Sequence, residues 1–136
     1  MDEMKLVPIA HVNSELHDRA AAPRQGDEDA PDAWLTFSAD VADGLRGITV
    51  GAELLVLTWF HLSTRDELLT RPRSDPNNPI TGVFNTRSPN RPNPIGLHRV
   101  RVLVVDGTRL KVSDMEALHG TPVIDVKPVL DRHRER

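Results

Sequence analysis

The sequence predicts a mainly β protein: a small, single-domain β-barrel with a short helix and long polar loops. Several short segments alternate apolar and polar residues, which is the pattern of half-buried strands. Only one stretch has helical spacing, and no strand–helix–strand repeat is present. Closing such a sheet into a barrel removes its exposed edges. The 136 residues fit one domain spanning 1–136, with residues 131–136 as a charged, frayed tail.

The first half of the chain predicts two strands separated by a polar segment. Residues 5–12 (KLVPIAHV) read as a first strand, in which Pro8 indicates an edge or a bulge. Residues 17–32 carry Pro, Gly and a run of charges and predict a long loop or a mobile flap. Residues 33–38 (AWLTFS) alternate and predict a second strand.

The middle of the chain predicts a short helix and a central strand. Val41, Leu45 and Ile48 have helical spacing, so residues 39–48 predict a helix that Gly44 interrupts. Residues 52–62 (AELLVLTWFHL) are apolar on both faces, as in a buried central strand.

An irregular stretch follows the predicted central strand. In residues 63–80, Ser63 or Thr64 is placed to cap one helical turn before Pro72 stops it, and Asp-Pro and Asn-Pro turn signals come after.

The last third predicts strands and one hairpin. Residues 82–86 (GVFNT) predict a short strand. VRVLVV and TRLKV alternate on either side of Asp106 and Gly107, which predicts a hairpin with a tight turn. MEALHGTP predicts a turn, and VIDVK predicts a last strand that Pro128 ends.

Composition restricts the possible functions. The chain has no Cys, which excludes disulfides, thiolate metal sites and a Cys nucleophile, and suits a reducing compartment. The N-terminus is acidic and no apolar run is long enough to span a bilayer, so we expect a cytoplasmic protein that is not a membrane protein. The net charge of −3 argues against a general nucleic-acid binder.

The charge is unevenly distributed. Residues 1–64 hold four basic and eleven acidic side chains, whereas residues 65–101 hold seven arginines and three acids, a net of +4. Arginine suits bidentate recognition of carboxylate or phosphate groups. A solvated face that balances the acidic N-terminal part explains the same distribution equally well.

Several well-known site motifs are missing. The chain has no G-x-G-x-x-G after a strand, no phosphate-binding loop, no HExxH and no EF-hand loop. No two of its six histidines have the spacing of metal ligands, so we expect no metal site. Ser63 and Ser88 lack the context of a nucleophile and are better explained as turn hydroxyls.

One loop has an unusual composition. Residues 81–97 read TGVFNTRSPNRPNPIGL, in which three prolines fix the backbone and Asn90 and Asn93 favour turns. A stiff loop that carries Arg87 and Arg91 suits a small molecule with a carboxylate or phosphate, because little ordering entropy is lost on binding. A structural Ω-like loop with paired arginines is the alternative, and the residues alone do not decide between them.

The same loop resembles the signature of the TsaA-like family, also called the TrmO family, which reads GVFATRSP-x-RPNPIG. Three further blocks resemble the family in the same order: PIAHVNS (8–14), APRQG (22–26) and LHGTPVIDVKP (118–128). The resemblance covers about residues 6–130. His98 stands where the family commonly has Ser, and His119 where it commonly has Asp.

The resemblance implies a small β-barrel that binds S-adenosyl-L-methionine, works as a homodimer and methylates N6 of threonylcarbamoyladenosine in tRNA. By motif it implies these cofactor-binding residues: Pro23, Arg24, Gln25, Phe60, His61, Arg87, Leu97, Glu116, Ala117, Leu118 and His119. We expect Arg91 and Asn93 to bind the substrate.

The resemblance leaves the chemistry of proton removal open. His61, His119 and Glu116 are possible proton acceptors, and the catalytic residue stays unassigned. Two alternatives also remain: a methyltransferase of the same fold that acts on a small molecule or another RNA, and a non-catalytic module that binds S-adenosylmethionine or RNA.

Overall fold

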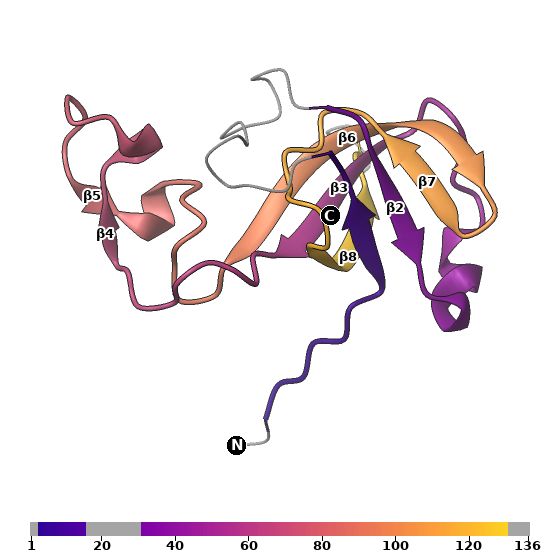
Figure 1. Ribbon diagram of the computed structural model, residues 1–136, viewed down its shortest axis with the longest axis horizontal. Coiled ribbons are helices and arrows are strands. Elements are labelled where there is room, and N and C mark those ends of the chain that lie inside the picture. Colours follow the sequence, from indigo (N-terminus) through magenta and orange to yellow (C-terminus); the bar gives the residue numbers. More distant parts are fainter. Residues whose placement is uncertain (1–2, 16–30, 131–136) are drawn as a thin grey trace.

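The computed structural model describes residues 3–15 and 31–130 of the chain (Figure 1). The predicted mainly β architecture is confirmed. Six strands close into a barrel in the order β1-β2-β7-β6-β3-β8, and every neighbouring pair is antiparallel. They are β1 (Ala10–Asn13), β2 (Ala33–Phe37), β3 (Glu53–Trp59), β6 (Ile95–Asp106), β7 (Arg109–Val112) and β8 (Pro122–Pro128).

The core fills the inside of this barrel with aliphatic side chains. It is built from alternate residues of each strand, such as Leu54 and Val56 of β3 and Val100 and Val102 of β6. The prediction that the central strand is buried on both faces is wrong, because β3 alternates strictly. Its outward residues, Leu55 and Leu57, are only half-buried.

The predicted short helix lies where expected but is a 3₁₀ helix, η1 (Ala39–Leu45). None of its residues is fully buried. Val41, Leu45 and Ile48 nevertheless pack against the barrel core, as their spacing indicated. A short connector with one apolar stripe suits the tighter 3₁₀ geometry.

The hairpin and the last strand are confirmed, with Gly107 at φ 60° in the turn. Two boundaries differ from prediction. β1 starts only at Ala10, so Pro8 lies before the strand, where no ladder hydrogen bond is needed. β6 begins at Ile95, before the predicted start, because β3 supplies partners as far as the pair Trp59 and Ile95. The predicted flap and tail lie largely or wholly outside the described residues.

Residues 60–94, called the arm here, leave the barrel at the end of β3 and return at the start of β6. They carry a two-stranded sheet of β4 (Leu69–Thr70) and β5 (Thr81–Gly82), and the 3₁₀ helices η2 (Pro72–Ser74) and η3 (Val83–Asn85). Figure 1 shows β4 and β5 well to one side of the barrel.

Two predictions fail in the arm. No helical turn follows Ser63 or Thr64, because the Thr64 backbone is bonded to the Pro-rich loop instead: its N–H donates to Asn90 Oδ1 and its carbonyl accepts from Arg91 N. The strand predicted at 82–86 ends at Gly82 and becomes η3, whose backbone starts with a hydrogen bond from Val83 N to Leu68 O of 2.9 Å. Among the helices that the structure describes, none is long and apolar enough to cross a membrane.

Candidate functional site: an arginine-lined groove beside the barrel

A groove of about 1950 Å³ lies between the barrel and the arm. Its walls come from six places: the start of β3, the start of the arm, the middle of the arm (67–78), the Pro-rich loop, the first half of β6, and the segment 113–121 that connects β7 to β8. Cavities that hold one drug-sized ligand measure about 300–1,000 Å³. The groove therefore has room for a cofactor and part of a second molecule.

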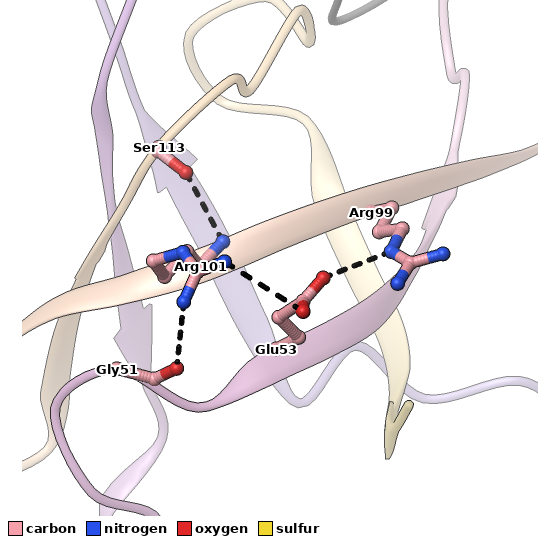
Figure 2. Close-up of polar contacts among 5 residues, drawn as sticks. All are labelled: Gly51, Glu53, Arg99, Arg101 and Ser113. Atoms are coloured by element: carbon pink, nitrogen blue, oxygen red, sulfur yellow. Dashed lines mark hydrogen bonds and ion pairs between the residues drawn. The ribbon is translucent and has the colours of Figure 1, made fainter. Parts of the chain in front are cut away.

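The outward face of β6 changes along the groove from apolar to charged. Ile95 and Leu97 are exposed by 39% and 41%, which gives two neighbouring aliphatic surfaces. Arg99 and Arg101 continue the same face, and Figure 2 shows both arginines directed at Glu53 of β3. A ligand with a flat apolar part and a charged part matches this change along one strand.

The charged end is held together by short contacts (Figure 2). The Arg99 Nε donates to Glu53 Oε2 at 3.0 Å, and Arg101 Nη2 lies 3.6 Å from Glu53 Oε1. Arg101 Nη1 also donates to Gly51 O, and its backbone N–H donates to Ser113 Oγ. One carboxylate thus orients two arginines on the groove wall.

The Pro-rich loop is tied to the start of the arm. Arg65 Nε donates to Pro92 O at 2.8 Å, and its Nη2 donates to Asn93 Oδ1 at 3.0 Å. The Arg65 guanidinium also lies 5.2 Å from the centre of the Trp59 ring. Asn90 Oδ1 accepts from Thr64 N at 3.1 Å. These bonds fix the loop's shape without a ligand.

The two arginines of the loop have different roles. Arg91 Nη1 donates to Thr86 O at 2.9 Å and to Ser88 O at 3.1 Å, so this side chain ties the loop to itself. Arg87 is exposed on the groove wall, and its guanidinium has no hydrogen bond or ion pair to any residue in 3–15 or 31–130. The structural interpretation therefore applies to Arg91, while the ligand-binding interpretation stays a prediction for Arg87.

The segment 113–121 closes one end of the barrel. Met115 and Ala117 are buried, whereas Glu116 and Leu118 face the groove. Thr121 N and Oγ1 both donate to Leu118 O, and the chain then reverses at Gly120 with φ 86°.

His119, which lies within this turn, is directed away from the groove. It lines a second, smaller hollow and its Nδ1 accepts from Ser14 N at 3.2 Å. His119 therefore lies apart from the other described residues of the predicted cofactor site, and its cofactor contact stays a prediction. The tight turn places residue 119 on the other side of the segment.

The structure brings most of the predicted site together. The following predicted residues line the groove: Phe60, His61, Arg87, Arg91, Asn93, Leu97, Glu116, Ala117 and Leu118. Residues 23–25, which carry Pro23, Arg24 and Gln25, lie outside the described part of the chain. No group of three or more His, Cys, Asp or Glu side chains that could hold a metal is present among residues 3–15 and 31–130.

A polar chain inside the barrel was missed from sequence. His98 Nδ1 lies 2.6 Å from Glu116 Oε1, and His98 Nε2 lies 2.7 Å from Thr58 Oγ1. His98 and Thr58 are both buried. The available signal was the alternation of residues 100–105, which, continued back along the chain, places residue 98 among inward positions, where a histidine needs polar partners.

These features define a class: an antiparallel β-barrel with an arginine-lined groove beside it. Comparison with known proteins gives the family. A sequence model of the tRNA-methyltransferase O N-terminal domain matches residues 11–133, and this chain belongs to that family.

Individual relatives agree. The chain is 42% identical over 124 residues to an S-adenosyl-L-methionine-binding protein of Archaeoglobus fulgidus, covering 91% of this chain and 88% of that one. It is 36% identical over 127 residues to a putative S-adenosylmethionine-dependent methyltransferase of Pseudomonas aeruginosa, covering 89% of this chain and 52% of that one.

A crystal structure of TrmO from Pseudomonas aeruginosa superposes with a TM-score of 0.74 at 28% identity, covering 95% of this chain. The present chain spans 57% of that protein's length.

Proposed function

We propose that this chain is an S-adenosyl-L-methionine-dependent methyltransferase that acts on tRNA. The observation that carries the proposal is the continuous groove, which passes from exposed aliphatic side chains to arginines in a chain of this family. The family is one of methyltransferases by its printed description, and curated relatives are named for binding S-adenosyl-L-methionine.

The groove residues fit the parts of S-adenosylmethionine. Leu97, with Leu118 across the groove, offers apolar walls for adenine. Arg87, which has no partner among the described residues, suits the methionyl carboxylate. The Glu116 carboxylate suits the positive sulfonium. We assign cofactor binding to these groove residues: Phe60, His61, Arg87, Leu97, Glu116, Ala117 and Leu118, together with Pro23, Arg24 and Gln25 by family motif.

We propose N6 of threonylcarbamoyladenosine in tRNA as the methyl acceptor. The family's printed description names tRNA methylation only, and the N6 position rests on the sequence resemblance; the arginines on the groove walls would contact phosphates. Arg91 and Asn93 face the groove from the Pro-rich loop and are the proposed substrate contacts. Such binding weakens with salt, because each phosphate contact releases counterions.

Methyl transfer to an amine needs positioning above all. S-adenosylmethionine, when bound, supplies a methyl group on a cationic sulfur. The walls of the groove hold the amine nitrogen in line with that methyl, and such orientation accounts for much of the rate. The amine proton leaves for a base, and of the three candidates only His61 and Glu116 line the groove.

We further propose that the chain works as a homodimer through the arm. Five large apolar side chains of the arm are 58–77% exposed: Leu62, Leu68, Leu69, Ile80 and Phe84. Monomeric proteins rarely expose so many apolar residues on one small substructure. A two-fold contact would bury the same surface on both copies.

A second candidate is a module that binds S-adenosylmethionine without methylating. It is favoured by the relatives named only as binding proteins and by the 57% coverage of the TrmO structure. Incubation with tRNA and methyl-labelled S-adenosylmethionine distinguishes the two. Label in tRNA, located by nucleoside mass spectrometry in methylated threonylcarbamoyladenosine, supports the enzyme. Calorimetric binding of the cofactor without label in any RNA supports the module.

A further inference from the structure

Three polar side chains form a continuous hydrogen-bonded chain from the barrel interior to the groove. Thr58 on β3 and His98 on β6 are 0% and 2% exposed. Thr58 Oγ1 lies 2.7 Å from His98 Nε2, and His98 Nδ1 lies 2.6 Å from Glu116 Oε1. Glu116 comes from the segment that closes the barrel, and 14% of its side chain is exposed.

Chemistry fixes the direction of these bonds for a neutral His98. An ionised carboxylate only accepts, so His98 Nδ1 carries the hydrogen that it donates to Glu116. His98 Nε2 then has a lone pair, and the Thr58 hydroxyl donates to it. The ring is also held by the edge of Phe60, whose centroid lies 5.8 Å away at an interplanar angle of 83°.

Only one oxygen of Glu116 is used by this chain. Oε1 binds His98, while Oε2 has no hydrogen bond to any residue in the described ranges. Among the described residues, every buried side-chain oxygen or nitrogen has a hydrogen-bond partner. Since Oε2 has none, it is not buried and is accessible from the groove side. Because Glu116 lines the groove, that accessible oxygen is presented to a ligand.

Stability alone is a weak explanation for this arrangement. A buried ion pair or polar pair is often matched in stability by apolar residues of similar size. The surrounding positions of the barrel, such as Val56 and Val100, are already aliphatic. The chain of bonds instead gives the Glu116 carboxylate a single orientation at a surface where ligands bind.

We propose that Thr58 and His98 are positioning residues that hold the Glu116 carboxylate toward the positive sulfur of bound S-adenosylmethionine. This contact sets the preference for the cofactor over its product, S-adenosylhomocysteine, whose sulfur is uncharged. The inference rests on the proposed function. A fixed carboxylate strengthens binding of the sulfonium but not of the thioether. The demethylated product therefore leaves more readily than the cofactor.

The test measures the affinities of both compounds by calorimetry in the full chain. Wild type binds S-adenosylmethionine more tightly than S-adenosylhomocysteine. His98→Leu and Glu116→Gln lower S-adenosylmethionine affinity about 10-fold, the size of a lost charge-assisted contact, with little change for the product. His98→Asn keeps a donor near the Nδ1 position and restores much of the preference. His11→Leu, an exposed histidine on β1, is the matched control.

Thr58→Val, close in size to the native residue, lowers the preference less than His98→Leu and serves if the latter does not fold. If His98→Leu loses affinity for both compounds equally, its role is merely structural and the inference is overturned. An unchanged ratio of the two affinities in His98→Leu has the same meaning. If His98→Leu does not fold, an unchanged ratio in Thr58→Val overturns the inference. Wild type that binds neither compound refutes the proposed function itself, and the inference with it.

Discussion

Gly96 lies at the most crowded point of the groove floor, and replacing it with alanine tests the packing directly. Gly96 on β6 faces Thr58 on β3 in the ladder. A Cβ added there would lie 2.5 Å from Thr58 Oγ1 and 2.7 Å from Phe60 Cε2. Carbon atoms in contact normally lie about 3.5–4.0 Å apart, so both side chains would have to move.

The two movements differ in energetic cost. The Phe60 ring is half-buried and swings outward with little resistance, although its edge contact with His98 is then lost. Thr58 is fully buried, and rotating its hydroxyl leaves His98 Nε2 without a donor. Overpacking costs about 1–3 kcal/mol, and an unsatisfied buried acceptor costs about 1–3 kcal/mol. We expect Gly96→Ala to lower the free energy of unfolding by roughly 2–5 kcal/mol.

Thermal and denaturant unfolding measure this change. At this chain length, a loss of that size lowers Tm by roughly 10 °C. Gly44→Ala is the control, since an added Cβ there meets nothing within 4 Å and its φ is not in the left-handed region. That change is expected to be neutral or to stabilise by about 0.4–1 kcal/mol. If the two variants unfold alike, Thr58 and Phe60 do not press on β6 as described.

Three further predictions concern charges and the arm. Arg91→Ala removes two hydrogen bonds to loop carbonyls and lowers the free energy of unfolding by about 1–3 kcal/mol. Arg87→Ala leaves Tm unchanged and weakens S-adenosylmethionine binding. A larger loss of Tm in Arg87→Ala than in Arg91→Ala, or weaker calorimetric binding in Arg91→Ala than in Arg87→Ala, would contradict these roles. For the proposed dimer, light scattering is expected to give a dimer for wild type and a folded monomer for Phe84→Asp, at a side chain that is 77% exposed; an unaltered dimer places the interface elsewhere. Glu53→Gln changes unfolding free energy by less than about 1 kcal/mol, because both of its arginine partners are exposed; a loss above about 2 kcal/mol in denaturant melts would show that the pair is structural.

Sequence predicted those strands whose alternation is local. Residues 33–37 and the hairpin around Gly107 each show a period of two, and both form, as does the last strand, which was predicted from the apolar residues before Pro128. The start of β6 was missed, because Ile95 to Arg99 includes Gly96 and His98 and lacks an apolar pattern. Pairing with β3 determines that part of the strand, and pairing partners are not visible in a local pattern.

The candidate site was likewise predictable only where the information is local in the sequence. The Pro-rich composition predicted a stiff loop with exposed binding groups, and Arg87 has the character of such a group. The internal role of Arg91 depends on turns that direct its guanidinium back to Thr86 O, and composition does not give that direction. The pair of His98 and Glu116 joins positions 18 residues apart through the closed barrel, so only the fold reveals it.

The position of the arm within the barrel has a consequence for how such proteins diversify. Trp59 and Ile95 face each other in the β3–β6 ladder, and Phe60 N donates to Pro94 O at 2.8 Å at the neck of the arm. Residues 60–94 therefore form one long insertion at the tip of a hairpin and contribute no strand to the barrel. Insertions, deletions and exchanges in residues 60–94 can therefore accumulate while the barrel and its ladder register stay the same.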